Sequence, residues 1–164
     1  MRTMVWLAIA LILAFLVFSA LANAETLEQR IERHEGYREC VYMDTLGNPT
    51  IGFGHLLKRP VPENLCWSKN KIHAVLAHDI DRAGKNAAFD YGAGFHALPD
   101  VVKDVLTEMA FQLGGSGLAR FGVFLGYIQK SEYERAADDL LGTRVAKQAP
   151  GRIMELAALL RTAK

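Results

Sequence analysis

The sequence predicts an α+β fold in which a small lobe carrying a β-hairpin is joined by one long helix to an all-helical lobe. The first observation is that β-forming residues, interrupted by turn-forming ones, are concentrated in residues 38–55. The second is that apolar residues recur at helical spacing from residue 68 onward. A groove between two such lobes is a common place for a ligand to bind.

The first predicted element is a short helix that ends near Glu35. Thr26 and Gln29 have the spacing of a capping box, which marks a helix N-terminus. Ile31 lies one turn into this helix, at a position that suits an apolar face. Gly36 follows Glu35 and is expected to end the helix.

The hairpin comes next, with strands predicted over residues 38–43 and 49–55. Residues 44–48 between them carry turn chemistry. Gly52 and Gly54 are expected to keep the second strand slim, so that a polymer can lie close against it.

The remaining elements are predicted to be helices. Ser68 can cap a long helix that runs to about Ala88 and joins the two lobes. Ser131 begins a second capping-box pattern, and Pro150 suits the first turn of a last helix. The expected ranges of the later helices are 99–113, 122–129, 131–141 and from 150 onward.

Composition and charge exclude some classes of protein. The chain has 164 residues and is 51% hydrophobic, which is enough to bury a core. Its formal net charge is +1, so it lacks the basic excess that is typical of a nucleic-acid-binding protein. We predict no nucleic-acid partner and no cofactor.

Residues 1–24 are predicted to be an N-terminal signal or signal-anchor segment, and residues 25–164 the folded domain. Arg2 precedes an apolar run over residues 4–22, and residues 22–24 fit the small-x-small pattern of signal-peptidase sites. The run is also long enough to span a bilayer. We therefore expect export, and a cleaved signal, a permanent anchor and a signal-anchor that later leaves the membrane are all compatible with the pattern.

Cys40 and Cys66 are the two cysteines of the chain. In an exported protein such a pair more often forms a disulfide than a metal site, and two ligands do not make a zinc site. We therefore predict no metal. Chain-entropy arguments give a disulfide closing this loop a stabilisation of about 3 kcal/mol. Two buried free thiols are the alternative.

Glu35 and Asp44 are candidates for a catalytic pair of carboxyls. Glycosidic bonds are commonly cut by two carboxyls, one donating a proton and the other activating water or attacking the sugar. Glu35 is expected at the end of a helix and Asp44 at the end of the following strand, so both can face one cleft. Because the chain has 18 acidic residues, composition alone does not select these two.

The spacing around these two residues resembles the signature of the T-even phage lysozyme family, glycoside hydrolase family 24. That family has Glu, eight residues, Asp or Cys, five residues and Thr, a pattern met by Glu35, Asp44 and Thr50. The matching stretches are residues 33–38, 41–47, 50–57, 78–81, 111–114 and 148–152, so the similarity covers most of residues 26–161.

This resemblance implies a lysozyme-like fold and an endolysin. Such an enzyme hydrolyses the β-1,4 bond between N-acetylmuramic acid and N-acetylglucosamine in bacterial peptidoglycan, which causes host cell lysis. It implies that Glu35 is the general acid, whereas Asp44 and Thr50 position and deprotonate a water that attacks with inversion. Inversion requires carboxyls about 6.5–9.5 Å apart. The alternative for Thr50 is a β-branched strand residue without a catalytic role.

The resemblance also implies roles for residues outside this trio. His55 and Asp79 are expected to form a structural pair that links the hairpin to the long helix. Phe124 departs from the polar residues found at its position in the best-known family members. For Phe111, packing in the core is the alternative to contact with substrate. The residues expected to contact substrate are Leu56, Phe111, Gln112, Asp139 and Arg152.

The implied partners are the glycan strands of peptidoglycan and, through residues 4–22, the inner membrane before cleavage or release. We expect a monomer that is exported to the host periplasm, first tethered to the host inner membrane by its N-terminal segment. Two other functions fit parts of the sequence. A lytic transglycosylase uses one catalytic Glu and leaves an anhydro product, and a membrane-anchored wall-binding lysis factor needs no catalysis.

Overall fold

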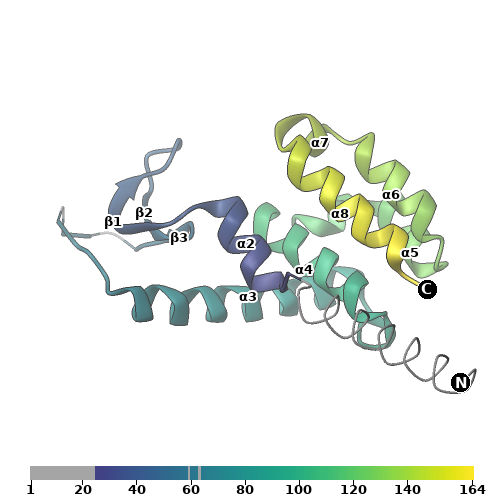
Figure 1. Ribbon diagram of the computed structural model, residues 1–164, viewed down its shortest axis with the longest axis horizontal. Helices are drawn as coiled ribbons and strands as arrows, with labels where there is room; N and C mark the ends of the chain where they lie inside the picture. The colour runs from purple at the N-terminus through teal and green to yellow at the C-terminus, as the bar shows by residue number, and fades with distance from the viewer. Residues whose placement is uncertain (1–24, 59, 63) are drawn as a thin grey trace, which may run out of the picture.

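The computed structural model describes residues 25–58, 60–62 and 64–164, and the predicted N-terminal segment, residues 1–24, lies outside the described residues. A small three-stranded sheet and a group of helices form two lobes along one long helix, as Figure 1 shows. This is the predicted α+β arrangement. Within the described ranges, no helix is long and apolar enough to cross a membrane.

Helix α2, Leu27–Glu35, begins with the predicted capping box. The Thr26 hydroxyl accepts a hydrogen bond from the backbone N–H of Gln29, and the Gln29 side chain accepts one from the backbone N–H of Thr26. The helix ends at Gly36, which has a φ of 72° and donates its N–H to the Glu32 carbonyl. Glu35 is therefore the last helical residue, directly before a backbone conformation that favours glycine.

The sheet is antiparallel in the order β1-β2-β3, with β1 at Arg38–Met43, β2 at Pro49–Gly52 and β3 at His55–Leu56. Thr50 lies in the middle strand, where it pairs with Tyr42 of β1 and with Leu56 of β3.

The prediction of one strand over residues 49–55 is wrong. Gly52 and Gly54 have φ values of 68° and 87°, and they reverse the chain between β2 and β3 rather than keeping one strand slim. Gly52 is also crowded, because a Cβ there would lie 2.8 Å from Cγ2 of Ile72. The two glycines thus supply both a tight reversal and a close approach of the sheet to the long helix.

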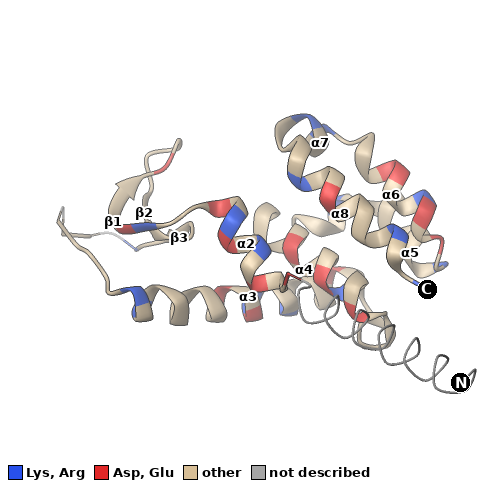
Figure 2. Ribbon diagram, in the orientation of Figure 1, with Lys and Arg blue, Asp and Glu red and all other residues tan. Residues whose placement is uncertain are grey.

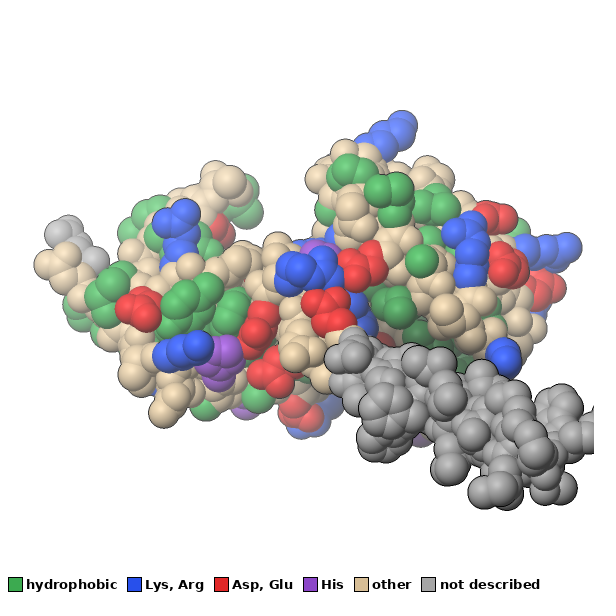
Figure 3. Space-filling view, in the orientation of Figure 1, with side chains coloured by type: hydrophobic (Ala, Val, Ile, Leu, Met, Phe, Trp, Pro, Cys, Tyr) green, Lys and Arg blue, Asp and Glu red, His purple; other side chains and the backbone are tan. Residues whose placement is uncertain are grey.

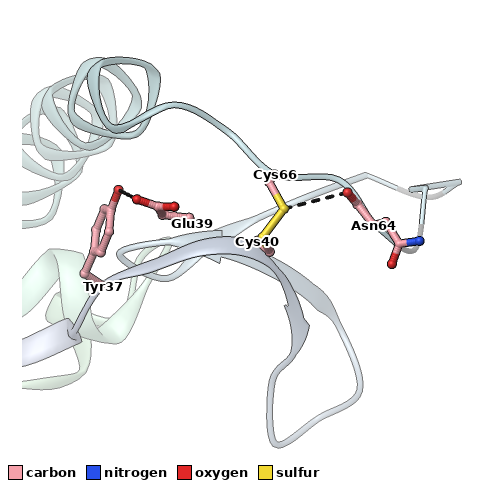
Figure 4. The surroundings of a disulfide bond; sticks show 5 residues. All are labelled: Tyr37, Glu39, Cys40, Asn64 and Cys66. Atoms are coloured by element: carbon pink, nitrogen blue, oxygen red, sulfur yellow. Dashed lines mark hydrogen bonds between the residues drawn. A yellow bond between two sulfur atoms is a disulfide. The ribbon is translucent and has the colours of Figure 1, made fainter.

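Cys40 and Cys66 form a disulfide that ties β1 to the segment preceding the long helix (Figure 4). The two cysteines also face each other in an isolated antiparallel bridge. On either side of it, the Val41 N–H donates to the Leu65 carbonyl at 2.9 Å, and the Trp67 N–H donates to the Glu39 carbonyl at 2.9 Å. The alternative of two free thiols is therefore wrong.

Helix α3, Lys69–Tyr91, runs through both lobes and begins at the predicted cap, where the Ser68 hydroxyl accepts a hydrogen bond from the Lys71 N–H. It buries Ile72 and Leu76 in the small lobe and Ala83 and Ala87 in the helical lobe. The helix continues three residues beyond the predicted end at Ala88, because no Gly or Pro lies between Ala88 and Gly92.

The helical lobe is built around α4. Its elements are η1 (Phe95–Ala97), α4 (Asp100–Leu113), η2 (Leu118–Arg120), α5 (Gly122–Gln129), α6 (Tyr133–Leu141), α7 (Arg144–Gln148) and α8 (Pro150–Thr162). Pro150 lies in the first turn of α8, as predicted. Helix α7 was not predicted, although Thr143 caps it by accepting from the Ala146 N–H.

The predicted capping box at Ser131 is wrong. Ser131 has a φ of 58°, and α6 begins only at Tyr133 without any side-chain cap. Ser131 instead donates its N–H to the Ile128 carbonyl and closes the turn after α5. Its conformation therefore serves the end of one helix rather than the start of the next.

Among the described residues, two clusters of buried apolar side chains form the interiors of the lobes. The small one consists of Ile31, Phe53, Ile72 and Leu76. The large one fills the helical lobe, with side chains from α3, α4, α5, α6 and α8. Phe111 packs against both clusters, so the two lobes share part of their interior.

Candidate active site

Glu35 is held by an arginine of the other lobe. Its Oε1 forms an ion pair with Nη2 of Arg152 at 2.8 Å, and the side chains of Glu35 and Arg152 are 24% and 11% exposed, respectively. Arg152 comes from the first turn of α8, so the pair joins the end of α2 to the start of α8. An ion pair in such a partly buried place is screened less than an exposed one, and it holds the carboxyl toward Arg152.

The second oxygen of Glu35 faces Gly54. A Cβ at position 54 would lie 3.7 Å from Oε2, and Gly54 itself lines the cleft between the lobes. Arg152 contacts Oε1, and Oε2 is the oxygen on the side of Gly54. One oxygen of Glu35 therefore contacts Arg152, and the other faces Gly54, which forms the glycine edge of the cleft.

Asp44 is fixed by the turn that joins β1 to β2. Its Oδ1 accepts hydrogen bonds from the backbone N–H groups of Leu46, at 2.8 Å, and Asn48, at 2.7 Å. Its Oδ2 accepts one from the Asn48 side-chain amide at 3.1 Å. The Asn48 backbone N–H, followed by its side chain and the other turn N–H groups, lowers the pKa of Asp44. The carboxyl is thus an oriented anion.

Thr50 is buried in β2, and its hydroxyl donates to the Asn48 carbonyl at 3.1 Å. The same carbonyl accepts the Asp44 N–H at 2.9 Å. Asn48 therefore links Asp44 and Thr50 through both its backbone and its side chain. Asn48 is a functional residue that was not predicted, although an Asn between two candidate residues in a predicted turn was a usable signal.

His55 and Asp79 form the expected contact between the sheet and α3, with Nδ1 2.6 Å from Oδ2. Asp79 is 6% exposed, and its other oxygen lies 2.9 Å from Nη2 of Arg82. Both partners of the pair come from elements that form the cleft wall. The contact therefore holds β3 and α3 at a fixed separation, which is a structural role.

A cleft of about 450 Å³ lies between β3, α3 and the end of α4. Leu56 and Phe111, two of the predicted substrate contacts, line it. Its walls are Gly54, His55, Leu56, Asp79, Arg82, Ala83, Asn86, Ala110, Phe111, Gly114 and Gly115. This volume suits a ligand of a few sugar rings, since pockets for small ligands measure about 300–1,000 Å³.

The other predicted contacts do not line this cleft. Gln112 is partly buried, with an Oε1 that has no hydrogen-bond partner among the described residues. Asp139 lies partly exposed on α6. Arg152 bonds Glu35 instead, and Phe124 is fully buried in the helical core. Phe124, which departs from the family pattern, therefore serves packing.

Within the described ranges, one group of side chains has metal-ligand spacing. Glu28, Glu32 and His73 offer ligand atoms within 4.8 Å of one another. None of them lines the interlobe cleft, and Nδ1 of His73 already contacts Oε1 of Glu32 at 2.8 Å. We assign this group no ligand, because partly exposed carboxyls commonly cluster without a metal.

Comparison of the sequence with known proteins identifies a family. A family model described as phage lysozyme matches residues 32–161. The chain is 29% identical over 138 residues to the pre-baseplate central spike protein Gp5 of Enterobacteria phage T4, in an alignment that covers 68% of this chain and 23% of that protein. It is 22% identical over 160 residues to probable T4-type lysozyme 2 of Dictyostelium discoideum, covering 84% and 94% of the two chains.

Proposed function

This chain belongs to the phage lysozyme family, and from that premise we propose that it is an endolysin that hydrolyses the glycan strands of peptidoglycan. The bond it cuts is the β-1,4 linkage between N-acetylmuramic acid and N-acetylglucosamine. The observation that carries the proposal is the placement of Glu35, held by Arg152 with its free oxygen toward the glycine edge of the interlobe cleft.

In the proposed reaction, Glu35 donates the proton on Oε2 to the leaving glycosidic oxygen as the bond to the anomeric carbon breaks. A water bonds to the opposite face of that carbon and gives its proton to Asp44. The Thr50 hydroxyl already donates to the Asn48 carbonyl, so it contributes a lone pair that accepts a hydrogen bond from the water. The product has inverted configuration and a reducing end.

We further propose that residues 1–24 deliver the enzyme to the host periplasm, where residues 4–22 first tether it to the inner membrane and it then acts as a monomer. The sequence pattern of a basic start, an apolar run and small residues supports export. The Cys40–Cys66 disulfide agrees with that destination, because disulfides persist in oxidising compartments such as the periplasm.

The decisive experiment compares the wild-type chain with Glu35→Gln on isolated peptidoglycan. Glu35→Gln keeps the shape of the side chain but removes the acidic proton, so kcat should fall by about 10²–10⁴-fold. Glu39→Gln is the matched control, because Glu39 is an exposed carboxyl of β1 that bonds Tyr37 rather than Arg152. It should keep wild-type activity within about twofold.

Product analysis in ¹⁸O-labelled water separates the alternatives. A hydrolase leaves reducing ends that contain the label, whereas an anhydro product would replace the proposal with a lytic transglycosylase. If Glu35→Gln cleared a peptidoglycan suspension as fast as the wild-type chain, the proposal would be contradicted and a non-catalytic wall-binding factor would be favoured.

A further inference from the structure

Three consecutive residues at the end of α2 bond two residues of α8. Arg33 Nη2 lies 2.8 Å from Glu155 Oε1, His34 Nε2 lies 3.1 Å from Glu155 Oε2, and Glu35 Oε1 lies 2.8 Å from Arg152 Nη2. Arg152 and Glu155 are three apart on α8 and therefore lie on the same helix face. We call this set of five residues the α2–α8 clamp.

His34 extends the clamp into the interior. Its side chain is 10% exposed, and its Nδ1 lies 2.7 Å from Oε1 of Glu108 on α4, which is 1% exposed. The other oxygen of Glu108 accepts from Nε of Arg30 at 3.1 Å. The His34 ring thus lies between a carboxylate of α4 and a carboxylate of α8, and it contacts both.

Further charged groups surround this ring. Nη1 of Arg33 lies 3.1 Å from His34 Nε2, and Arg33 also bonds Glu25 at 2.7 Å. The hydrogen bonds to Glu25 and Glu155 raise the pKa of Arg33, so this side chain stays cationic. Figure 2 marks acidic and basic residues along the ribbon where α2 meets the helical lobe, and Figure 3 shows acidic, basic and histidine side chains gathered there.

The end of α2 depends on these contacts because its apolar anchoring is slight. The helix has nine residues, and Ile31 is the one fully buried apolar side chain among them. Glu35 is the final helical residue, and the glycine after it offers little resistance to rotation. Polar contacts rather than burial therefore set the direction of the Glu35 carboxyl.

We propose that His34 is the positioning residue for Glu35. By bridging Glu108 and Glu155, its ring fixes the last turn of α2 against α4 and α8, so that Glu35 reaches Arg152 with Oε2 toward the cleft. The proposal rests on the proposed function, in which Glu35 is the acid. Misplacing a reacting group by about 1 Å can cost about 10²-fold in rate, so the ring can govern kcat without touching substrate.

The test uses His34→Gln in the full chain, with His73→Gln as matched control. His73 of α3 also joins α2 to a neighbouring helix through a carboxylate, Glu32 of α2, at 2.8 Å, but its ion pair is with Glu32 and not with a residue of the clamp. Three quantities are measured for each variant, well below its melting temperature: kcat and KM on soluble glycan chains, the melting temperature, and the ¹³C titration curve of the Glu35 carboxyl.

For His34→Gln we expect kcat to fall by about 10–100-fold while KM stays within about threefold, and the titration curve of Glu35 to shift. Glu155→Gln removes the negative charge of the α8 contact and leaves the buried Glu108 paired with His34. It should therefore lower kcat by a smaller factor than His34→Gln does. His73→Gln should leave kcat and the Glu35 curve unchanged.

Wild-type kcat and an unchanged Glu35 curve in His34→Gln would overturn the proposal, even if the melting temperature fell. If the wild-type chain cleaves no glycan, the proposed function fails, but the titration still decides the positioning role. A shift of the Glu35 curve in His34→Gln and not in His73→Gln would then support it, and equal curves would overturn it.

Discussion

The two lobes are stabilised by different means. The helical lobe is held by a large apolar cluster drawn from five helices. The sheet lobe has a small apolar cluster, and it adds a disulfide and the contact between His55 and Asp79. The residues proposed for catalysis belong to the sheet lobe and to its border, where Glu35 ends α2.

This contrast shows how a site can be precise where apolar burial is scarce. A bond between named polar atoms has a direction, whereas apolar contact is non-directional. Asp44 is fixed by such hydrogen bonds, and Glu35 is held by its ion pair with Arg152. The large apolar cluster of the helical lobe contributes most of the apolar burial that stabilises the folded chain.

The largest effect should come from the helical core. Leu156→Ala removes a fully buried side chain of α8 and should lower the free energy of unfolding by about 2–5 kcal/mol. Met154→Ala on the same helix is the control, since Met154 is 59% exposed. Urea unfolding followed by circular dichroism measures both. Similar losses for the two variants would show that burial in this lobe is not the main source of stability.

An intermediate effect is expected from the disulfide of the sheet lobe. Replacing both Cys40 and Cys66 with Ala should lower the free energy of unfolding by about 3 kcal/mol, because the loop that they close gains freedom in the unfolded chain. Hydrogen exchange should show the loss of protection mainly in β1 and β2, with α8 little changed. An equal loss in both lobes would contradict the idea that the two are stabilised by different means.

The smallest effect should appear in the turn that holds Asp44. Its pKa lies below the ordinary value of 3.8, chiefly through the backbone N–H of Asn48. A carboxyl with a lowered pKa in the folded state stabilises that state above pH 3.8, and the contribution is lost as the pH falls through the folded-state value.

Asn48→Ala removes the side-chain donor and keeps the backbone N–H, so the pKa of Asp44 should rise part of the way toward 3.8. A ¹³C titration of the Asp44 carboxyl measures this, with Asn70→Ala on the exposed face of α3 as control. A complete return to 3.8 would show that the backbone bond does not hold the carboxyl as the structure indicates.

Local patterns predicted much of this fold. The Thr26 and Gln29 capping box and Gly36 defined both ends of α2. Ser68 and Pro150 marked the starts of α3 and α8, because caps and first-turn prolines act within a few residues.

What the sequence could not predict depends on backbone conformation or on distant partners. Gly52 and Gly54 suited a slim strand as well as a reversal, and only their positive φ values distinguish the two. Ser131 had cap chemistry but adopts a conformation that closes the preceding helix. The contact of Glu35 with Arg152 arises from how α2 packs on α8, which local spacing does not contain.

The place of Phe111 has a thermodynamic consequence. Its side chain packs against both apolar clusters and also lines the cleft. A glycan bound there would therefore contact a residue of α4 that packs against the interiors of both lobes. A ligand that binds only the folded state stabilises that state by mass action. Binding in the cleft would therefore raise the free energy of unfolding of the whole chain. A saturating fragment would then raise the melting temperature of both lobes together.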